Sequence, residues 1–374
     1  MGMSNPIARA LIADAKQARV PITVNFELLP ICNLDCKMCY IRTDGAEVRK
    51  QGGLIPADAW LGLARELLDA GTLFLLLTGG EVFLYPEFRF LYENLVKMGF
   101  VLTINTNATL IDGDTVNWLK QFPPKCVSIS LYGVSNEAYG ALCGKTGMFD
   151  RVDRAISLLQ SAGITVECKT LLTPLNAQEM QPCLDYCRER RIPCELASYA
   201  FPPARKTGSR TQVRFRPAEA ARCQLEIDRL MSSTEEFEQN IRSYLEKYEA
   251  GRRQPGTQQQ GLSCAAANSS CWISWQGHMT PCAMLNEPYT LPFQQGFSAA
   301  WEALKVKADA LLLSPECSVC EKRSVCTVCP AASAAETGAI CKASRYHCEM
   351  TEALISDMKR YAEAHHLEWR NTVP

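Results

Sequence analysis

The chain has 374 residues, 47% of them apolar, and a formal net charge of −1 at neutral pH. This length allows two or three domains, and the apolar content is normal for a globular core, which excludes a mainly disordered chain. A charge so close to zero provides no overall positive field, so we expect neither nucleic acid nor a membrane surface as a partner.

No stretch reaches the ~20 uninterrupted apolar residues of a membrane span, and residues 1–21 indicate a helical extension of mixed polarity. We therefore expect a cytoplasmic protein. The chain has 19 cysteines. A reducing compartment does not maintain disulfides, so metal ligation is the leading explanation for the cysteines that cluster.

Strand-like runs alternate with helix-like stretches between residues 22 and 200. Such alternation indicates right-handed βα units, and hence an α/β fold with a parallel sheet or partial barrel. In that architecture the chemistry collects at the carboxyl ends of the strands. The expected strands are 22–28, 72–77, 101–105, 126–131, 164–170 and 193–198, and the clearest helices are 57–70, 86–99 and 149–163.

The second half of the chain has a different composition. Segment 203–216 looks like a connection between domains and leads to one helix that opens at Pro217 and runs to about residue 250. Nine cysteines then fall between residues 264 and 348, ahead of a final amphipathic helix and tail. The basic residues of segment 203–216 are Arg205, Lys206, Arg210, Arg214 and Arg216.

The first cysteine cluster, Cys32, Cys36 and Cys39, directly follows the first expected strand with the spacing C-x3-C-x2-C. Three thiolates leave a tetrahedral zinc ion one ligand short. They can instead hold three irons of a cubane and leave the fourth iron open for chemistry. The alternative is a loop that happens to contain three cysteines, but three exposed thiols have little structural use.

This spacing after a first strand resembles the signature of the radical S-adenosylmethionine (SAM) superfamily. The resemblance implies that Cys32, Cys36 and Cys39 hold a [4Fe-4S] cluster and that its open iron binds the amino and carboxylate groups of SAM. Reduction then cleaves SAM to a 5′-deoxyadenosyl radical. The family usually has an aromatic residue just before the third cysteine, whereas this chain has Met38 there and Tyr40 after it. The resemblance implies that Tyr40 is one of the residues that bind SAM.

Gly79, Gly80 and Glu81 end the second expected strand. Two glycines allow the backbone to approach a ligand closely, and the acid can accept hydrogen bonds from an ammonium group. The three residues resemble the family's GGE motif, which implies contact with the methionine amino group of SAM.

Two further pairs of polar residues lie on or just after strands, Asn105 with Asn107 and Ser128 with Ser130. Each pair has one parity, so both members point into the barrel if the strand continues that far. The resemblance implies contacts with the ribose and methionine parts of the cofactor. Many relatives carry Asp after the serine-bearing strand, where this chain has Tyr132.

The cysteines near the C-terminus include a run C-x2-C-x5-C-x2-C that ends at Cys329. Spacing alone permits zinc or iron-sulfur, in a module whose folding depends on its metals. The pattern resembles the SPASM domain, which typically holds two auxiliary [4Fe-4S] clusters, although the family usually ends C-x3-C. The resemblance implies one cluster at Cys264, Cys271, Cys282 and Cys329, and another at Cys317, Cys320, Cys326 and Cys348, with Cys341 as a competitor of Cys348.

The remaining cysteines lie within expected strands, helices or their connections, and we interpret them as small core residues. They are Cys126, Cys143, Cys168, Cys183, Cys187, Cys194 and Cys223.

Together the motifs imply a partial (β/α)6 TIM-like barrel followed by a small, cysteine-rich, cluster-binding domain. The expected organisation is a helical extension (1–21), the radical SAM barrel (22–215), a helical connection (216–260), a SPASM-like domain (261–350) and a C-terminal helix and tail (351–374). Little room precedes residue 22 for a leader-binding domain. Recognition of a leader would then fall to the barrel rim, segment 203–216 or a separate partner.

The resemblance implies an enzyme that abstracts hydrogen from a peptide or protein side chain, most often in a ribosomally made peptide. The product is a crosslink, a thioether, an oxidised residue or an epimer. The cofactors are SAM and three [4Fe-4S] clusters, with flavodoxin or ferredoxin as reducing partner. The auxiliary clusters suit electron transfer, which makes a net oxidation plausible.

Other functions remain as alternatives. Relatives that mature sulfatases carry an Asp directly after the cysteine equivalent to Cys282, and this chain has Ala283, which disfavours formylglycine formation. A radical SAM enzyme with a small-molecule substrate, a non-catalytic iron-sulfur electron carrier and a zinc-stabilised binding module are the others. A carrier has no need of an open iron or of the motif Gly79, Gly80 and Glu81.

Overall fold

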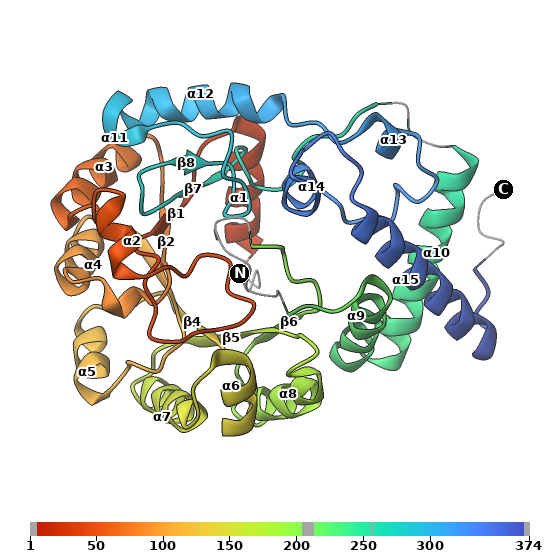
Figure 1. Ribbon diagram of the computed structural model, residues 1–374, viewed down its shortest axis with the longest axis horizontal. Helices are drawn as coiled ribbons and strands as arrows, with labels where there is room; N and C mark the ends of the chain where they lie inside the picture. Colours follow the sequence, from red (N-terminus) through yellow and green to blue (C-terminus); the bar gives the residue numbers. More distant parts are fainter. Residues whose placement is uncertain (1–5, 204–212, 255, 257, 370–374) are drawn as a thin grey trace.

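Six parallel strands alternate with helices in the first part of the chain. The computed structural model describes residues 6–203, 213–254, 256 and 258–369. Neighbouring strands pair in chain order without closing the ring, so the predicted α/β fold with a partial, six-stranded barrel is confirmed (Figure 1). The strands are β1 (Thr23–Glu27), β2 (Phe74–Thr78), β3 (Val101–Thr106), β4 (Cys126–Ser130), β5 (Val166–Leu171) and β6 (Cys194–Ala197).

Amphipathic helices surround this sheet (Figure 1). Each buries its apolar side in the main core; Trp60 and Leu67 of α3, for example, are fully buried there. The surrounding helices are α3 (Ala57–Asp69), α4 (Phe88–Lys97), α5 (Gly113–Gln121), α7 (Met148–Ser161) and α8 (Met180–Glu189). The other elements before residue 200 are α1 (Pro6–Ala18), α2 (Gly45–Lys50), η1 (Val82–Leu84), α6 (Asn136–Cys143) and η2 (Ala177–Glu179).

Polar residues occupy two rows across the sheet. Ser130, Lys169 and Glu195 stand at paired positions of β4, β5 and β6. In the row before them, Ser128 of β4 pairs with Asn105 of β3 on one side and with Glu167 of β5 on the other. Because side chains two residues apart point to the same face of a strand, these rows give one face of the sheet its polar character near the strand ends.

The cysteine-rich segment extends the sheet of the barrel. Strand β7 (Ser270–Ile273) pairs parallel with β1, and β8 (Met279–Thr280) pairs antiparallel with β7. The indole Nε1 of Trp272 donates to Oε2 of Glu27 over 2.9 Å, and both residues are buried. The sheet order is therefore β6-β5-β4-β3-β2-β1-β7-β8 within the described residues, so segment 261–350 is attached to the barrel through shared strands.

The expected single helix between Pro217 and residue 250 is wrong. Two helices are present, α9 (Pro217–Met231) and α10 (Thr234–Arg253). The second begins at a capping box, in which Ser233 Oγ accepts from the Glu236 N–H and the Glu236 carboxylate accepts from the Ser233 N–H. Both helices pack against α15 (Arg345–Ala364), which starts earlier than the predicted residue 351 (Figure 1).

Four further helices are described in the C-terminal part: α11 (Pro292–Gln295), α12 (Phe297–Asp309), α13 (Pro315–Ser318) and α14 (Pro330–Thr337). Of the basic segment, Arg205, Lys206 and Arg210 lie outside the described residues. Arg214 is described, and its guanidinium forms an ion pair with Glu336 over 2.6 Å. None of the helices in the described part of the chain is long and apolar enough to span a membrane.

Candidate active site

A cavity of about 330 Å³ opens at the carboxyl ends of the barrel strands. One loop lines it with Cys32, Cys36 and Cys39. The end of β2 lines it with Gly79 and Gly80. The other sequence-predicted residues in its wall are Tyr40, Asn105, Asn107 and Ser130, and Met38 and Tyr132 line it as well.

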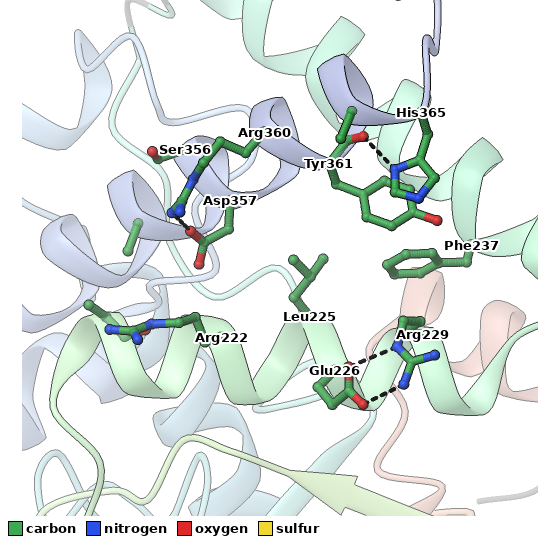
Figure 2. A pocket seen from close by; sticks show the side chains of 13 residues that line it. Arg222, Leu225, Glu226, Arg229, Phe237, Ser356, Asp357, Arg360, Tyr361 and His365 are labelled. Carbon is green, nitrogen blue, oxygen red and sulfur yellow. Dashed lines mark hydrogen bonds and ion pairs between the residues drawn. The ribbon is translucent and has the colours of Figure 1, made fainter.

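A larger cavity, of about 720 Å³, lies outside the barrel between α9, α10 and α15 (Figure 2). Its arginines Arg229 and Arg360 form ion pairs with Glu226 and Asp357. No cysteine is found among the described residues that line it. Because the Glu226 and Asp357 carboxylates are paired with arginines and the three clustered cysteines line the smaller cavity, the smaller cavity is the candidate active site.

The sulfurs in this cavity face hydrogen-bond donors. Cys32 Sγ accepts from the Leu34 N–H at 3.4 Å and from Asn107 Nδ2 at 3.6 Å, and Cys39 Sγ accepts from the Arg42 N–H at 3.3 Å. Burial raises the pKa of the Cys32 thiol to about 12, so a metal has to displace its proton. Three thiols with donors behind them and a cavity in front fit a cluster that keeps one iron open.

The same geometry bears on a single zinc ion. Among the described residues, no group of three or more His, Cys, Asp or Glu side chains is arranged to hold one metal ion. A zinc ion requires its sulfurs to converge about 2.3 Å from one centre. In a [4Fe-4S] cluster each thiolate binds a different iron, so the sulfurs stand further apart.

Close packing of two loops explains Gly79 and Gly80. A Cβ atom at Gly79 would lie 2.5 Å from the Leu29 carbonyl oxygen, and one at Gly80 would lie 2.3 Å from that of Ile31. The Gly80 N–H donates to Leu29 O over 2.7 Å. The glycines therefore bring the end of β2 against the start of the cysteine loop, besides exposing backbone to the cavity.

The Glu81 side chain lies outside the cavity wall and is fully buried. Its Oε1 accepts from Thr106 Oγ1 at 2.7 Å and its Oε2 accepts from the Asn107 N–H at 2.8 Å. Burial raises the pKa of this carboxyl group. The Glu81 carboxylate thus holds the loop that follows β3, and its contact with the cofactor stays a prediction.

Ser128 is buried and is not among the residues that line the cavity, although its neighbour Asn105 in the same row is; its contact with the cofactor stays a prediction. Five polar residues that the sequence analysis did not single out line it among the described residues, namely Thr78, Thr106, Lys169, Thr170 and Glu195. The Lys169 ammonium lies 3.6 Å from Glu195 Oε2 and 3.7 Å from Glu167 Oε1. The alternation of Glu167 and Lys169 along one strand was the available signal, since both point to one face.

One auxiliary set of cysteines is gathered in space. Burial raises the pKa values of the Cys317 and Cys348 thiols, and the nearby Cys320 and Cys326 raise them further. Like charges act in this way only at short range. Cys341, the competitor of Cys348, is exposed.

The other auxiliary set lies on separate elements. Cys271 is fully buried in β7, and Cys264 is exposed ahead of that strand. Cys282 follows β8, and Cys329 caps α14, where its Sγ accepts from the Ala332 N–H at 3.4 Å. A cluster shared by these four residues stays a prediction.

The cysteines interpreted as core residues are buried, apart from Cys194, which is half-buried. Cys168 of β5 pairs with Cys194 of β6, and Cys187 is buried in α8. Cys143 lies at the end of α6, and its carbonyl oxygen accepts from the Asp35 N–H of the cysteine loop over 3.0 Å.

Comparison with known proteins gives a family match for the barrel. Residues 26–188 match the model of the radical SAM superfamily. The antilisterial bacteriocin subtilosin biosynthesis protein AlbA of Bacillus subtilis is 25% identical over 273 residues, which cover 73% of this chain and 57% of AlbA. The match therefore spans little more than half of that relative.

Two further proteins match over most of the chain. The AdoMet-dependent heme synthase of Methanosarcina barkeri is 23% identical over 333 residues, 85% of this chain and 93% of the synthase. The structure of Streptococcus suis SuiB bound to precursor peptide SuiA superposes with a TM-score of 0.64 at 18% identity, over 93% of this chain and 82% of SuiB. The superposition agrees with the fold described above.

Proposed function

We propose that this chain, a radical SAM enzyme with its radical SAM domain at residues 26–188, forms a 5′-deoxyadenosyl radical that abstracts hydrogen from a peptide side chain. The observation that carries the proposal is the cavity in which Cys32, Cys36 and Cys39 meet the Gly79–Gly80 backbone. The superfamily implies SAM and one [4Fe-4S] cluster, which supply an electron and a cleavable sulfonium.

The residues of the cavity have separate roles in this proposal. Cys32, Cys36 and Cys39 hold the cluster, and Tyr40, Asn105, Asn107 and Ser130 bind and orient SAM. Lys169 supplies the positive charge that a methionine carboxylate requires. Its two carboxylate neighbours, Glu167 and Glu195, hold the ammonium at the cavity wall.

The shape of the surface beside the cavity favours a chain-like substrate. A further cavity, of about 440 Å³, lies between α2 and the β7–β8 hairpin. Ile41 lines this cavity and the candidate active site. A cavity that shares a wall residue with the radical site suits an extended peptide, because a peptide can place one side chain at the radical and a flanking residue in the neighbouring cavity. AlbA, named for bacteriocin biosynthesis, supports the same substrate class.

The auxiliary clusters and the partners complete the proposal. Cys317, Cys320, Cys326 and Cys348 hold one [4Fe-4S] cluster, and Cys264, Cys271, Cys282 and Cys329 hold the other. Both remove or deliver electrons during a net oxidation of the peptide. A flavodoxin or ferredoxin in the cytoplasm is the reductant, and neither nucleic acid nor a membrane takes part.

A second candidate is a small-molecule substrate. The match to the heme synthase favours it, because that match covers nearly all of the relative. Formylglycine formation is disfavoured, since Ala283 follows Cys282 and offers no carboxylate to accept a proton.

The test of the substrate class compares two reactions of the anaerobically reconstituted enzyme. Short peptides encoded beside its gene are incubated with SAM and dithionite, and an iron porphyrin replaces them in the parallel reaction. The proposal predicts a mass change in one peptide and transfer of deuterium from that labelled peptide to 5′-deoxyadenosine. Turnover of the porphyrin with every peptide unchanged would establish the second candidate instead.

A further inference from the structure

A single carboxylate lines the candidate active site. Among the described residues in the wall of this cavity, Glu195 is the only Asp or Glu. It lies on β6 opposite Lys169 of β5, which in turn lies opposite Ser130 of β4. Because the three residues stand in one row of the sheet, their side chains point to the same face. The register of the strands therefore places this carboxylate at the cavity.

The other ionisable groups of the wall are unsuited to accept a proton. In the proposed enzyme the three cluster cysteines bind iron. Lys169 is an ammonium and Tyr40 and Tyr132 are phenols, so at neutral pH these groups already carry their protons. No histidine is found among the described residues of the wall. Glu195 is thus the one side chain in the described wall that offers a free base.

The ion pair with Lys169 leaves the Glu195 carboxylate accessible. The ammonium lies 3.6 Å from Oε2, and the Glu195 side chain is 70% exposed. Glu167 lies 3.7 Å from the same ammonium, but its side chain is only 19% exposed and it is not among the residues that line the cavity. The two carboxylates beside Lys169 therefore differ in their access to a bound substrate.

Strand β6 also lies where a substrate can approach. It stands at one end of the sheet order in the described part of the chain, with β5 as its neighbour. The residues proposed to hold the cluster and SAM belong to β3, β4 and β5 or to the loops that follow β1, β2 and β3. β6 adds Glu195 and Ala197 to the wall. Glu195 is therefore on the side of the cavity that remains for the substrate once SAM is bound.

A net oxidation of a peptide releases a proton as well as an electron. The 5′-deoxyadenosyl radical takes one hydrogen atom from a C–H bond and leaves a carbon radical. When a neighbouring S–H, N–H or O–H group bonds to that carbon, its hydrogen leaves as a proton and one electron passes to an oxidised auxiliary iron-sulfur cluster. Two bonds to hydrogen break and one bond to carbon forms. Ala283 offers no carboxylate to accept the proton.

We propose that Glu195 is the catalytic base that accepts this proton from the peptide. The inference rests on the proposed function and narrows its substrate class. The substrate is then a peptide in which an S–H, N–H or O–H group bonds to the carbon that has lost its hydrogen, as in a thioether or another heteroatom crosslink. Epimerisation requires no such base, because the carbon radical there regains a hydrogen atom.

The experiment uses the anaerobically reconstituted full-length enzyme with SAM, dithionite and the deuterated peptide that changes mass in the test of the substrate class. Glu195→Gln keeps the size of the side chain and removes its basicity. The rate at which modified peptide forms should fall about a hundredfold, as for loss of a general base. In a single turnover the variant should still form the wild-type amount of deuterated 5′-deoxyadenosine, because hydrogen abstraction precedes the proton transfer.

Matched variants separate proton transfer from the positioning of Lys169. Glu167→Gln removes the other carboxylate beside this ammonium, so it shares every effect that passes through Lys169. The dissociation constant for SAM, measured by equilibrium dialysis, should rise equally in Glu167→Gln and Glu195→Gln, by no more than about fivefold for a partly exposed ion pair. Only Glu195→Gln should lose the peptide product. Glu189→Gln, at the exposed end of α8, should behave as wild type.

Chemical rescue gives a readout that a purely structural role would not change. Glu195→Ala leaves space for a small carboxylate at the cavity wall. Added sodium formate should therefore restore part of the peptide product in this variant, because formate can accept the proton. Formate should have no effect on wild type or on Glu189→Ala.

The outcomes distinguish this inference from the proposed function. A wild-type rate of peptide modification in Glu195→Gln overturns the inference and leaves the proposed function standing. Equal loss of product in Glu195→Gln and Glu167→Gln, without rescue of Glu195→Ala by formate, also overturns it, because both carboxylates then act through Lys169. Wild-type enzyme that forms no 5′-deoxyadenosine, or that leaves every peptide unchanged, refutes the proposed function itself.

Discussion

The Glu81 carboxylate accepts a hydrogen bond from the backbone N–H of Asn107 at 2.8 Å. The Asn107 side chain in turn donates from Nδ2 to Asn33 Oδ1 over 2.9 Å and to Cys32 Sγ over 3.6 Å. The end of β2, the loop after β3 and the cysteine loop thus form one connected network. A change at Glu81 should reach the cavity although Glu81 does not line it.

Glu81→Gln tests that connection. The amide has one oxygen, so its NH₂ group meets either Thr106 or the Asn107 N–H and leaves a buried donor unpaired, at a cost of about 2 kcal/mol. We expect lower thermal stability and weaker SAM binding, measured by calorimetry and equilibrium dialysis. Glu87→Gln is the control, because Glu87 is an exposed carboxylate that also accepts from a backbone N–H. Equal effects of the two substitutions would contradict the network.

The stability difference between wild type and Glu81→Gln should also depend on pH. Burial raises the pKa of Glu81 in the folded state, so the folded protein binds its proton more tightly than the unfolded chain. The stabilisation of the folded state by this proton is complete below the unfolded pKa of about 4.3, and it is lost as pH rises through the raised folded pKa. The advantage of wild type in thermal midpoint should therefore shrink as pH rises from about 4.3 through the raised folded pKa of Glu81. A difference that grows over this range would contradict the assignment.

Lys169→Met tests the role of the lysine in the cavity wall. It removes the positive charge and keeps most of the side-chain volume, so the dissociation constant for SAM should rise about tenfold, as for loss of one charge-assisted hydrogen bond. Lys97→Met is the control, since Lys97 forms a comparable exposed ion pair, with Glu93 on α4. Unchanged SAM binding in Lys169→Met would exclude Lys169 from the SAM site.

Iron content tests the choice between Cys348 and Cys341. The wild-type chain should contain about twelve irons after anaerobic reconstitution, and Cys348→Ala should lose about four of them. Cys341→Ala should keep the full number, because Cys341 is exposed and Cys348 lies with Cys317, Cys320 and Cys326. Loss of iron in Cys341→Ala with none in Cys348→Ala would reverse the assignment. Zinc in the place of the auxiliary irons would exclude the clusters.

Sequence patterns located the six barrel strands, because each is an apolar or alternating run between helices of clear periodicity. They missed β7 and β8, which have only four and two residues and owe their pairing to β1. The break before Ser233 was also missed. The amphipathic pattern continues across the break, whereas the capping box at Ser233 begins a new helix.

For the candidate site, the cysteines and glycines could be found from spacing because their roles depend on neighbours in the chain. Glu81 and Cys143 could not be assigned in this way. The contacts of Glu81 with Thr106 and Asn107 are made 25 and 26 residues away. Cys143 meets the cysteine loop through a backbone hydrogen bond from Asp35, at the end of a helix that lies after β4. Lys169 was visible only as one charge in a strand, and its place in the cavity depends on the register of β4, β5 and β6.

The central claim is that Cys32, Cys36 and Cys39 hold the cluster that cleaves SAM. The direct measurement is 5′-deoxyadenosine, quantified by mass spectrometry after anaerobic incubation of reconstituted enzyme with SAM and dithionite. Wild type and Cys223→Ala should form it, and alanine at position 32, 36 or 39 should abolish it. A wild-type protein that contains iron-sulfur clusters but forms no 5′-deoxyadenosine, or equal formation by the three variants, would contradict the account.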